Sequence, residues 1–189
     1  MIKNIIFCIL LLGTTITNLA QDTTYDIQNS VLLIRLQSNE HLINYYLNSG
    51  DTLSAYQTQK TQTDLNNKII QDFKNEWSLS PVYFFLAEHS KEILSHNFSN
   101  VFLNTNRDKI NQKEQHEIKS NFFTAYIGKN PGTLKFNALV LCDQNLTQLK
   151  KPNPRYVRTY KRLGFLKREL KKSIRILQKK LKFHISRKQ

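Results

Sequence analysis

The stretch that decides the fold is FFTAYIGKNPGTLKFNALVLC, residues 122–142. Its two runs of branched and aromatic residues, 122–128 and 133–142, are typical of β-strands. Between them, KNPG (129–132) is a turn sequence, because proline and glycine both favour reversal of the chain. The stretch therefore predicts an antiparallel β-hairpin.

Three further apolar runs lie upstream of this hairpin. VLLIRLQ (31–37) is rich in branched residues, and PVYFFLAEH (81–89) begins with a proline at a position where no ladder N–H is lost. NVFLN (100–104) is a shorter third run. Together with the hairpin, these runs predict a mixed sheet of about five strands.

Two helices are predicted between the first two strands. The first covers about 39–48 and ends at SGD (49–51), where glycine suits a helix C-terminus and aspartate can cap the next helix. It places one group of apolar residues on one side: Leu42, Ile43, Tyr46 and Leu47. The second is expected over 52–77, with a polar first half that projects into solvent and an apolar seam in its second half. The seam consists of Leu65, Ile69, Ile70, Phe73 and Trp77. The pair forms a helical hairpin.

The rest of the chain completes the predicted fold. A polar connection with at most one weak helical turn covers 105–119, prolines interrupt 148–154, and a basic terminal helix is expected over about 165–183. This order predicts an α/β (α+β) fold, as a single domain over 31–189 that includes the basic C-terminal segment 150–189. A strand, a hairpin and a helix also end the thioredoxin-like fold, which is an analogy of topology alone because the redox motif C-x-x-C is absent.

The N-terminus has the pattern of a secretory signal peptide over residues 1–20, MIKNIIFCILLLGTTITNLA. Lys3 supplies positive charge, 5–12 is apolar, and cleavage is expected near Ala20. The apolar run is far shorter than the ~20 residues that a transmembrane helix needs. A buried N-terminal strand is the alternative. Cleavage would leave residues 21–30 as a flexible leader on a secreted or periplasmic protein without a transmembrane segment.

Cysteine usage limits the redox chemistry of the exported chain. The sequence has two cysteines, of which Cys8 leaves with the signal peptide and Cys142 stays without an intrachain partner. Cys142 ends an apolar run, and this position favours a buried structural cysteine over a reactive thiol or an intermolecular bridge. A single mature cysteine excludes thioredoxin chemistry.

The positive charge is concentrated at the C-terminus. Residues 150–189 contain 16 lysines and arginines against one acid, Glu169, whereas residues 1–149 contain 12 against 13. The formal net charge of +14 therefore belongs to the C-terminal segment. A nearly neutral body with a basic end indicates a partner that carries negative charge.

Two segments carry a resemblance to a known group of proteins. WSLSPVYFF (77–85) and ALVLCDQNLTQLKKPNPRYVRTYKRLGFLKR (138–168) resemble a group of exported proteins of Gram-negative bacteria, whose segments read W-x-x-x-PVYFF and QLKKP-x-P-x-YVRT. The resemblance covers most of residues 28–183. It implies a periplasmic setting, and it implies no activity, because none is attached to the group.

The basic C-terminal segment is the leading candidate for a binding surface. Its helix carries an apolar stripe, formed by Leu163, Leu166, Leu170, Ile174, Leu177 and Leu181. The candidate residues for contact with an anionic surface are Lys150, Lys151, Arg155, Arg158, Arg168, Lys171, Lys172, Arg175 and Lys179. Such a segment can bind anionic lipid, a polysaccharide or an acidic protein. The structural alternative is a helix that docks its stripe on the sheet and leaves its charges in water. Export argues against nucleic acid, which becomes the partner only if residues 1–20 are not a signal peptide.

A second, enzymatic hypothesis rests on polar residues at predicted strand ends. Glu88, His89 and Asp143 each follow an apolar run. If their strands are parallel neighbours, the three side chains would converge as a general base with its orienting partners, as in a small periplasmic hydrolase. The polar ends of ordinary strands are the structural alternative.

Common catalytic and cofactor motifs are absent from the sequence. It has no G-x-G-x-x-G, no G-x-x-x-x-G-K-[ST], no G-x-S-x-G and no H-E-x-x-H. Its five histidines, His41, His89, His96, His116 and His184, form no pair at helical spacing. We therefore expect no metal and no cofactor, and favour a binding protein over an enzyme.

Overall fold

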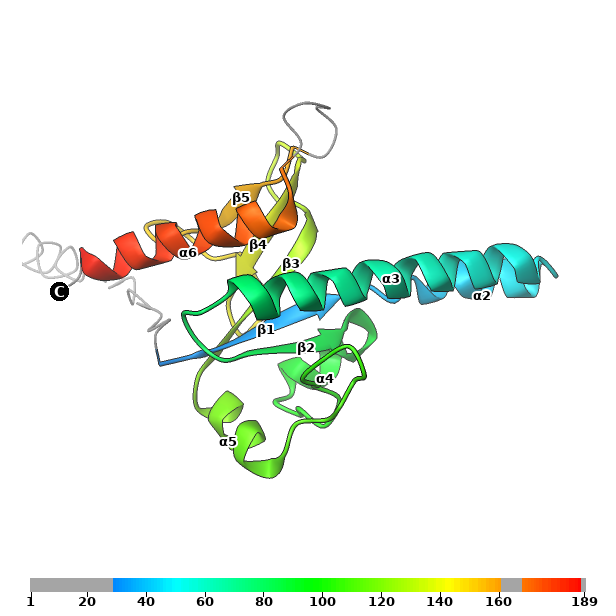
Figure 1. Cartoon of the computed structure of the whole chain (residues 1–189), viewed down its shortest axis with the longest axis horizontal. Helices are drawn as coiled ribbons and strands as arrows, with labels where there is room; N and C mark the ends of the chain where they lie inside the picture. The colour runs from blue at the N-terminus through cyan, green and yellow to red at the C-terminus, as the bar shows by residue number, and fades with distance from the viewer. Residues whose placement is uncertain (1–28, 161–167, 188–189) are drawn as a thin grey trace, which may run out of the picture.

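The computed structural model describes residues 29–160 and 168–187. Its centre is a five-stranded sheet in the order β2-β1-β3-β4-β5 (Figure 1). The strands are β1 (Val31–Leu36), β2 (Val82–Leu86), β3 (Phe122–Lys129), β4 (Asn137–Cys142) and β5 (Tyr156–Arg158). The expected signal peptide, and residues 21–28 of the expected leader, lie outside the described residues.

The sheet is mixed, as the sequence predicts. β1 pairs in parallel with both β2 and β3, while β3–β4 and β4–β5 are antiparallel. The β3–β4 pair is the predicted hairpin, although β4 begins at Asn137 and not at Thr133. β1 and β3 are neighbours in the sheet. The chain leaves β1 toward β2 on one side and leaves β3 toward β4 on the other, so the connections diverge between β1 and β3.

One predicted strand is wrong, and another takes its place. In the run 100–104 only Phe102 pairs with a strand, through a single bridge to Phe84. The chain then turns, because the Asn104 side-chain oxygen accepts hydrogen bonds from the backbone N–H groups of Asn106 and Asp108. The fifth strand is instead β5, which lies between the proline-interrupted stretch 148–154 and the predicted terminal helix, where no element was predicted.

The helical hairpin forms where the sequence predicts it. Helix α2 (Glu40–Asn48) is followed by Gly50 at a φ of 75°, a left-handed conformation in which glycine has no steric penalty. Helix α3 (Thr52–Glu76) is capped by Asp51, whose side chain accepts from the Ser54 N–H at 3.0 Å.

The hairpin projects from the body as an arm (Figure 1). Only Ile43 and Tyr46 of the expected apolar side of α2 are half-buried, and α2 has no fully buried residue. Leu42 and Leu47 are exposed instead, and so is Leu65, the first residue of the predicted seam on α3. The rest of that seam, from Ile69 to Trp77, packs in the main core.

Helix α6 (Leu170–Ser186) lies on the same face of the sheet as the second half of α3 (Figure 1). It buries Ile174, Leu177 and Leu181 against residues of β3, β4 and β5. The docking that the apolar stripe predicted is therefore confirmed for this part of the helix. The helix begins at Leu170, and 161–167, with the first two leucines of the stripe, lie outside the described residues.

Short helices cover the other face of β1 and β2. After β2 the chain forms a 3-10 turn, Ala87–His89, and helix α4 (Ser90–Leu94). Helix α5 (Gln112–Ser120) occupies the connection in which only a weak turn was expected. It forms because Asn111 and Glu114 make a capping box, in which each side chain accepts from the other residue's N–H. α5 buries Ile118 in this second core.

Candidate functional site

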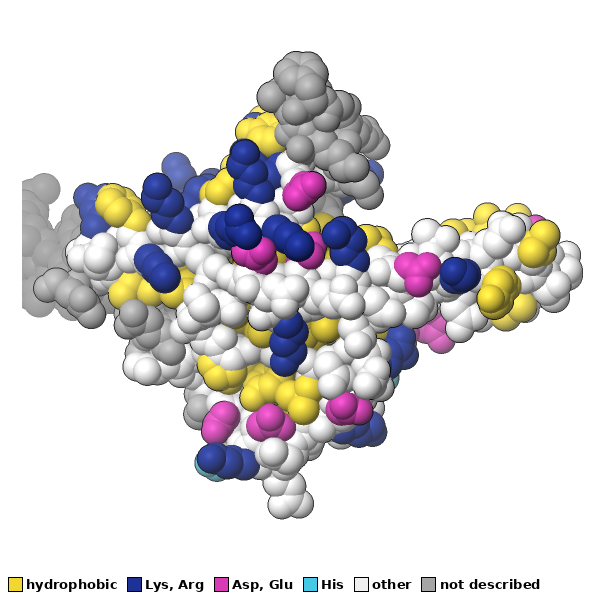
Figure 2. Space-filling view, viewed as in Figure 1, with side chains coloured by type: hydrophobic (Ala, Val, Ile, Leu, Met, Phe, Trp, Pro, Cys, Tyr) yellow, Lys and Arg dark blue, Asp and Glu magenta, His cyan; other side chains and the backbone are white. Residues whose placement is uncertain are grey.

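The basic residues of α6 lie on its outer side. Lys171, Lys172, Arg175, Lys179 and Lys182 are exposed, while the opposite side of the helix is buried. Figure 2 shows lysine and arginine side chains gathered over this helix, with a few acidic side chains among them. The helix thus presents a basic surface that is tied to the body by its apolar side.

Arg175 differs from its lysine neighbours because it has a carboxylate partner. Its Nε and an Nη lie 2.5 and 2.8 Å from the two carboxylate oxygens of Glu76, at the end of α3. The hydrogen bond from Arg175 holds the pKa of Glu76 below its usual range, and Glu76 in turn raises the pKa of Arg175. Next to this pair, Gln178 accepts from the Ser78 N–H and donates to the Glu76 carbonyl oxygen. Arg175 therefore joins α6 to α3, and the Glu76 carboxylate largely neutralises its charge toward an external partner.

Three other candidate arginines stack on aromatic rings. The Arg158 guanidinium lies 4.1 Å from the centre of the Phe136 ring, and Arg155 lies 5.5 Å from that of Tyr156. Arg168 stacks on Tyr160 at 5.0 Å and donates to the Arg158 carbonyl oxygen at 2.7 Å. Stacking holds these three guanidiniums against the protein surface but leaves their charge in place, so they can add to the charge of the lysines.

The lysines of the segment 150–189 carry most of the available charge. We call Lys171, Lys172, Lys179 and Lys182 the lysine face; all four are exposed on α6. Within the described residues, none of them has a carboxylate within ion-pair distance. Lys150 and Lys151 are also exposed, ahead of β5.

The structure does not bring the three strand-end residues together. Glu88 and His89 follow β2, whereas Asp143 follows β4, which is separated from β2 by β1 and β3 and runs in the opposite direction. Glu88 and His89 therefore lie at the opposite end of the sheet from Asp143. The geometry that the enzymatic hypothesis required is not present.

Each strand-end residue has local partners. Asp143 Oδ1 accepts from the backbone N–H groups of Asn145 and Thr147, both at 2.9 Å, which holds a turn. His89 Nδ1 lies 3.0 Å from Glu92 Oε1. Asn100 donates to the other oxygen of Glu92 at 2.7 Å, and these two hydrogen bonds lower the pKa of that carboxyl. Among the described residues, no nucleophilic side chain hydrogen-bonds to His89, whose partners are Glu92 and Asn100.

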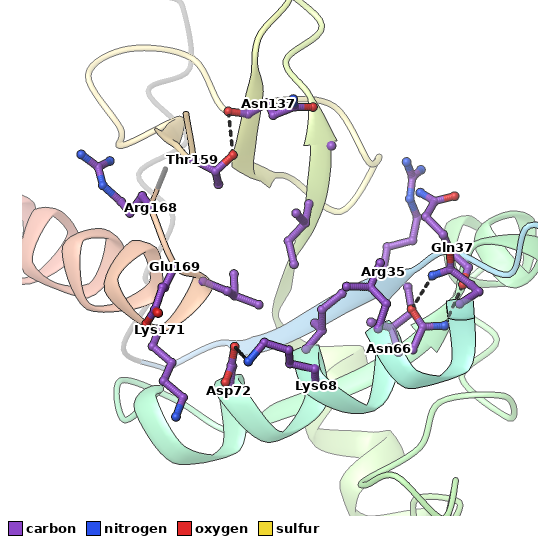
Figure 3. Close-up of a pocket in the computed structure, with 17 residues that line it drawn as sticks. Arg35, Gln37, Asn66, Lys68, Asp72, Asn137, Thr159, Arg168, Glu169 and Lys171 are labelled. Atoms are coloured by element: carbon purple, nitrogen blue, oxygen red, sulfur yellow. Dashed lines mark hydrogen bonds and ion pairs between the residues drawn. The ribbon is translucent and has the colours of Figure 1, made fainter. Parts of the chain in front are cut away.

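A pocket of about 650 Å³ lies between α3, the start of α6 and the ends of β1 and β3 (Figure 3). Its wall includes buried amides, among which Asn66 donates to the Gln37 carbonyl oxygen at 2.7 Å. Asp72 is also buried there, with Lys68 Nζ 3.8 Å from its Oδ2. This pocket carries charges of both signs, because acidic Asp72 and Glu169 face basic side chains.

A second pocket, of about 610 Å³, opens on the other side of the same sheet edge. The two pockets share Arg35, Gln37 and Gly128, at the carboxyl ends of β1 and β3. Sequence reasoning passed over Arg35, although a charged residue inside the apolar run VLLIRL was a usable signal.

The expected structural role of Cys142 agrees with its surroundings. The side chain is buried at the end of β4, and desolvation raises the pKa of its thiol to about 12. A thiol with this pKa stays protonated at neutral pH. Burial and the raised pKa therefore both agree with a structural role for Cys142.

Comparisons with known proteins add no assignment. No protein-family model, curated protein or solved structure matches the chain significantly. Over residues 29–160 and 168–187, no three or more histidine, cysteine or acidic side chains are grouped as a metal site would need. Within the same ranges no helix has both the length and the apolar character to cross a membrane.

Proposed function

We propose that this is an exported, non-catalytic protein whose lysine face contacts an anionic lipid surface. The observation that carries the proposal is the set of four exposed lysines on α6, none of which has a carboxylate within ion-pair distance in the described part of the chain. The signal-like residues 1–20 and the resemblance to exported proteins of Gram-negative bacteria support a periplasmic setting, where membranes with anionic lipids are accessible.

The docking of α6 determines what kind of contact this would be. Because Ile174, Leu177 and Leu181 are buried against the sheet, the helix cannot insert an apolar side into the bilayer while the domain stays folded. The attraction is then electrostatic. Each lysine near an anionic surface contributes about 1 kcal/mol, and salt screens this contribution.

Sedimentation with vesicles tests the proposal. The purified protein is mixed with vesicles of neutral phosphatidylcholine, or with vesicles that also contain anionic phosphatidylglycerol, at low and high salt. We expect binding to the anionic vesicles alone, and only at low salt. Changing the lysine face to glutamine (K171Q, K172Q, K179Q and K182Q) should reduce binding on the order of several hundredfold, at about fivefold for each lysine.

A charge-matched control separates the lysine face from net charge. Lys91, Lys109, Lys113 and Lys119 are exposed on α4, α5 and the loop between them, on the other face of the sheet. Changing these four to glutamine removes the same charge and should leave vesicle binding nearly unchanged. A specific role for α6 would be refuted if both variants lost vesicle binding equally. It would also be refuted if the wild-type protein did not bind the anionic vesicles. Binding to an acidic polysaccharide but not to vesicles would refute the lipid assignment.

A further inference from the structure

Arg35 is the one charged residue of β1, and its position in the sheet is unusual. In the parallel ladders it pairs with Phe85 of β2 and Tyr126 of β3, so it has a strand on each side. Its neighbours at alternate positions, Val31 and Leu33, are buried in the second core. A guanidinium is therefore placed on the face of the sheet where the strand is otherwise apolar.

In the part of the chain that the structure describes, the Arg35 side chain has no counter-charge. Its Nε is buried and has no hydrogen-bond partner, and the described residues include no carboxylate that pairs with it. The guanidinium lies over the Tyr126 ring, whose centre is 4.9 Å from the guanidinium carbon. Stacking occupies the flat side of a guanidinium and leaves its edge, with its N–H donors, free.

The edge of the sheet at Arg35 is where ligands bind in open α/β sheets. Such ligands lie in the crevice outside the carboxyl ends of the strands, at the point where the connections diverge. Here the divergence lies between β1 and β3, and the two pockets meet there at Arg35, Gln37 and Gly128. The crevice is therefore formed by the topology and not by one loop.

The pocket on the Tyr126 side has the chemistry of an anion site. Arg35 and Lys129 are its two cationic residues, and Gln37, Thr147 and Gln148 add polar groups. No acidic residue lines it. Cys142, which also lines it, brings no negative charge, because burial raises the pKa of this thiol to about 12. Asp72 and Glu169 line the other pocket.

We propose that the pocket lined by Arg35, Lys129 and Tyr126 binds a small organic anion through a carboxylate or phosphate group. The edge of the Arg35 guanidinium donates to the anion, because planar, bidentate recognition of these groups is characteristic of arginine. Lys129 supplies the second positive charge. At about 610 Å³ the pocket exceeds the size of inorganic phosphate and lies within the range of small-molecule sites. The site is separate from the lysine face.

Thermal unfolding in the presence of simple anions tests the site. The probes are inorganic phosphate, phenyl phosphate and benzoate, with benzyl alcohol as the uncharged control. We expect phenyl phosphate or benzoate to raise Tm in a saturable way, and inorganic phosphate to do so less. The two aromatic probes distinguish a phosphate ligand from a carboxylate ligand.

Three variants separate the site from other causes of an anion effect. R35Q should lose the Tm shift, and R35K should weaken it, because lysine keeps the charge without the planar fork. R155Q is the matched control: Arg155 also stacks on a tyrosine ring, but it lines neither pocket. R155Q, and the variant without the lysine face, should keep the full shift.

The expected stability of R35Q itself is part of the test. Because the guanidinium is half-buried without a counter-charge, its removal should leave Tm unchanged or raise it when no anion is present. If R35Q is too unstable to measure, the Arg35 Nε–Hε resonance of the wild-type protein gives an independent reading, and benzoate or phenyl phosphate should shift it. The proposal would be overturned if no anion shifted the Tm of the wild-type protein, or if R35Q and wild type shifted equally. It would also be overturned if the Nε–Hε resonance did not move.

Discussion

At the scale of single residues, the environment of a side chain decides its chemistry more than its identity does. Cys142 shows this for a thiol. It ends β4 opposite Thr124 of β3, and it is removed from water by the packing around it. Because desolvation disfavours the thiolate, the thiol is a small apolar group in the folded state.

Thiol labelling checks this description of Cys142. A C8S background leaves Cys142 as the single thiol, since the sequence has two cysteines. At neutral pH we expect a disulfide reagent to modify the native protein on the order of a hundredfold or more slower than the urea-unfolded chain, because an unfolded cysteine has an ordinary pKa near 8.5. Equal rates in the native and unfolded proteins would show that the thiol is accessible.

The residues also show what a single sequence can and cannot reveal about a site. The burial of Cys142 follows from the apolar run FNALVLC, which it ends. Whether Glu88, His89 and Asp143 converge depends on strand order and direction, which no local sequence pattern encodes, and so their predicted convergence was wrong. Arg35 was visible as a charge in an apolar strand, but the missing hydrogen bond of its buried Nε is a property of the tertiary structure.

At the scale of elements, helices and strands with strong local sequence patterns were predicted correctly, and those with weak patterns were not. The β3–β4 hairpin and the α2–α3 turn carry glycine, proline or a capping aspartate at the positions that need them. β5 has one buried residue, Val157, and is held by its pairing with β4, so it has almost no signal of its own. The run 100–104 is more apolar, yet the turn after Asn104 limits its pairing with the sheet to one bridge, from Phe102 to Phe84.

The capping box of α5 is visible in the sequence as Asn111 and Glu114, but the polar composition of 105–119 led to the prediction of a connection instead of a helix. Replacing Asn111 with alanine removes the acceptor for the Glu114 N–H, which lies 2.9 Å from Asn111 Oδ1. We expect N111A to lower the free energy of unfolding by about 1 kcal/mol in urea titrations. N106A is the control: Asn106 is exposed in the preceding loop, and the effect should stay within about 0.5 kcal/mol. A loss as large in N106A would refute the role of the cap.

At the scale of the whole molecule, two carboxyl groups with lowered pKa values contribute to the dependence of stability on pH. The folded-state pKa of Glu76 is lowered, first by its hydrogen bond from Arg175, and that of Glu92 is lowered, first by its hydrogen bond with His89. A lowered folded pKa contributes stability above the unfolded pKa, and this stability is lost as the pH falls through the folded pKa. Both groups therefore stabilise the protein at neutral pH and stop doing so in acid.

Thermal unfolding across a pH series measures this contribution. We expect Tm to be steady near neutral pH and to fall below about pH 5, where unfolded glutamates bind protons while Glu76 and Glu92 of the folded protein stay ionised. E76Q should make the acid limb shallower and lower Tm at neutral pH, because it removes the charge that faces Arg175. An acid limb that is unchanged in E76Q would mean that other carboxyls control it.

The arm formed by α2 and α3 affects how the molecule rotates in solution. α3 has 25 residues, so it is about 37 Å long, and it carries α2 beyond the edge of the sheet (Figure 1). A body extended in one direction turns slowly end over end and faster about its long axis. Amide N–H bonds in a helix lie nearly along its axis, so those of α3 sense mainly the slow rotation. Their ¹⁵N transverse relaxation is therefore faster than that of amides that lie across the long axis.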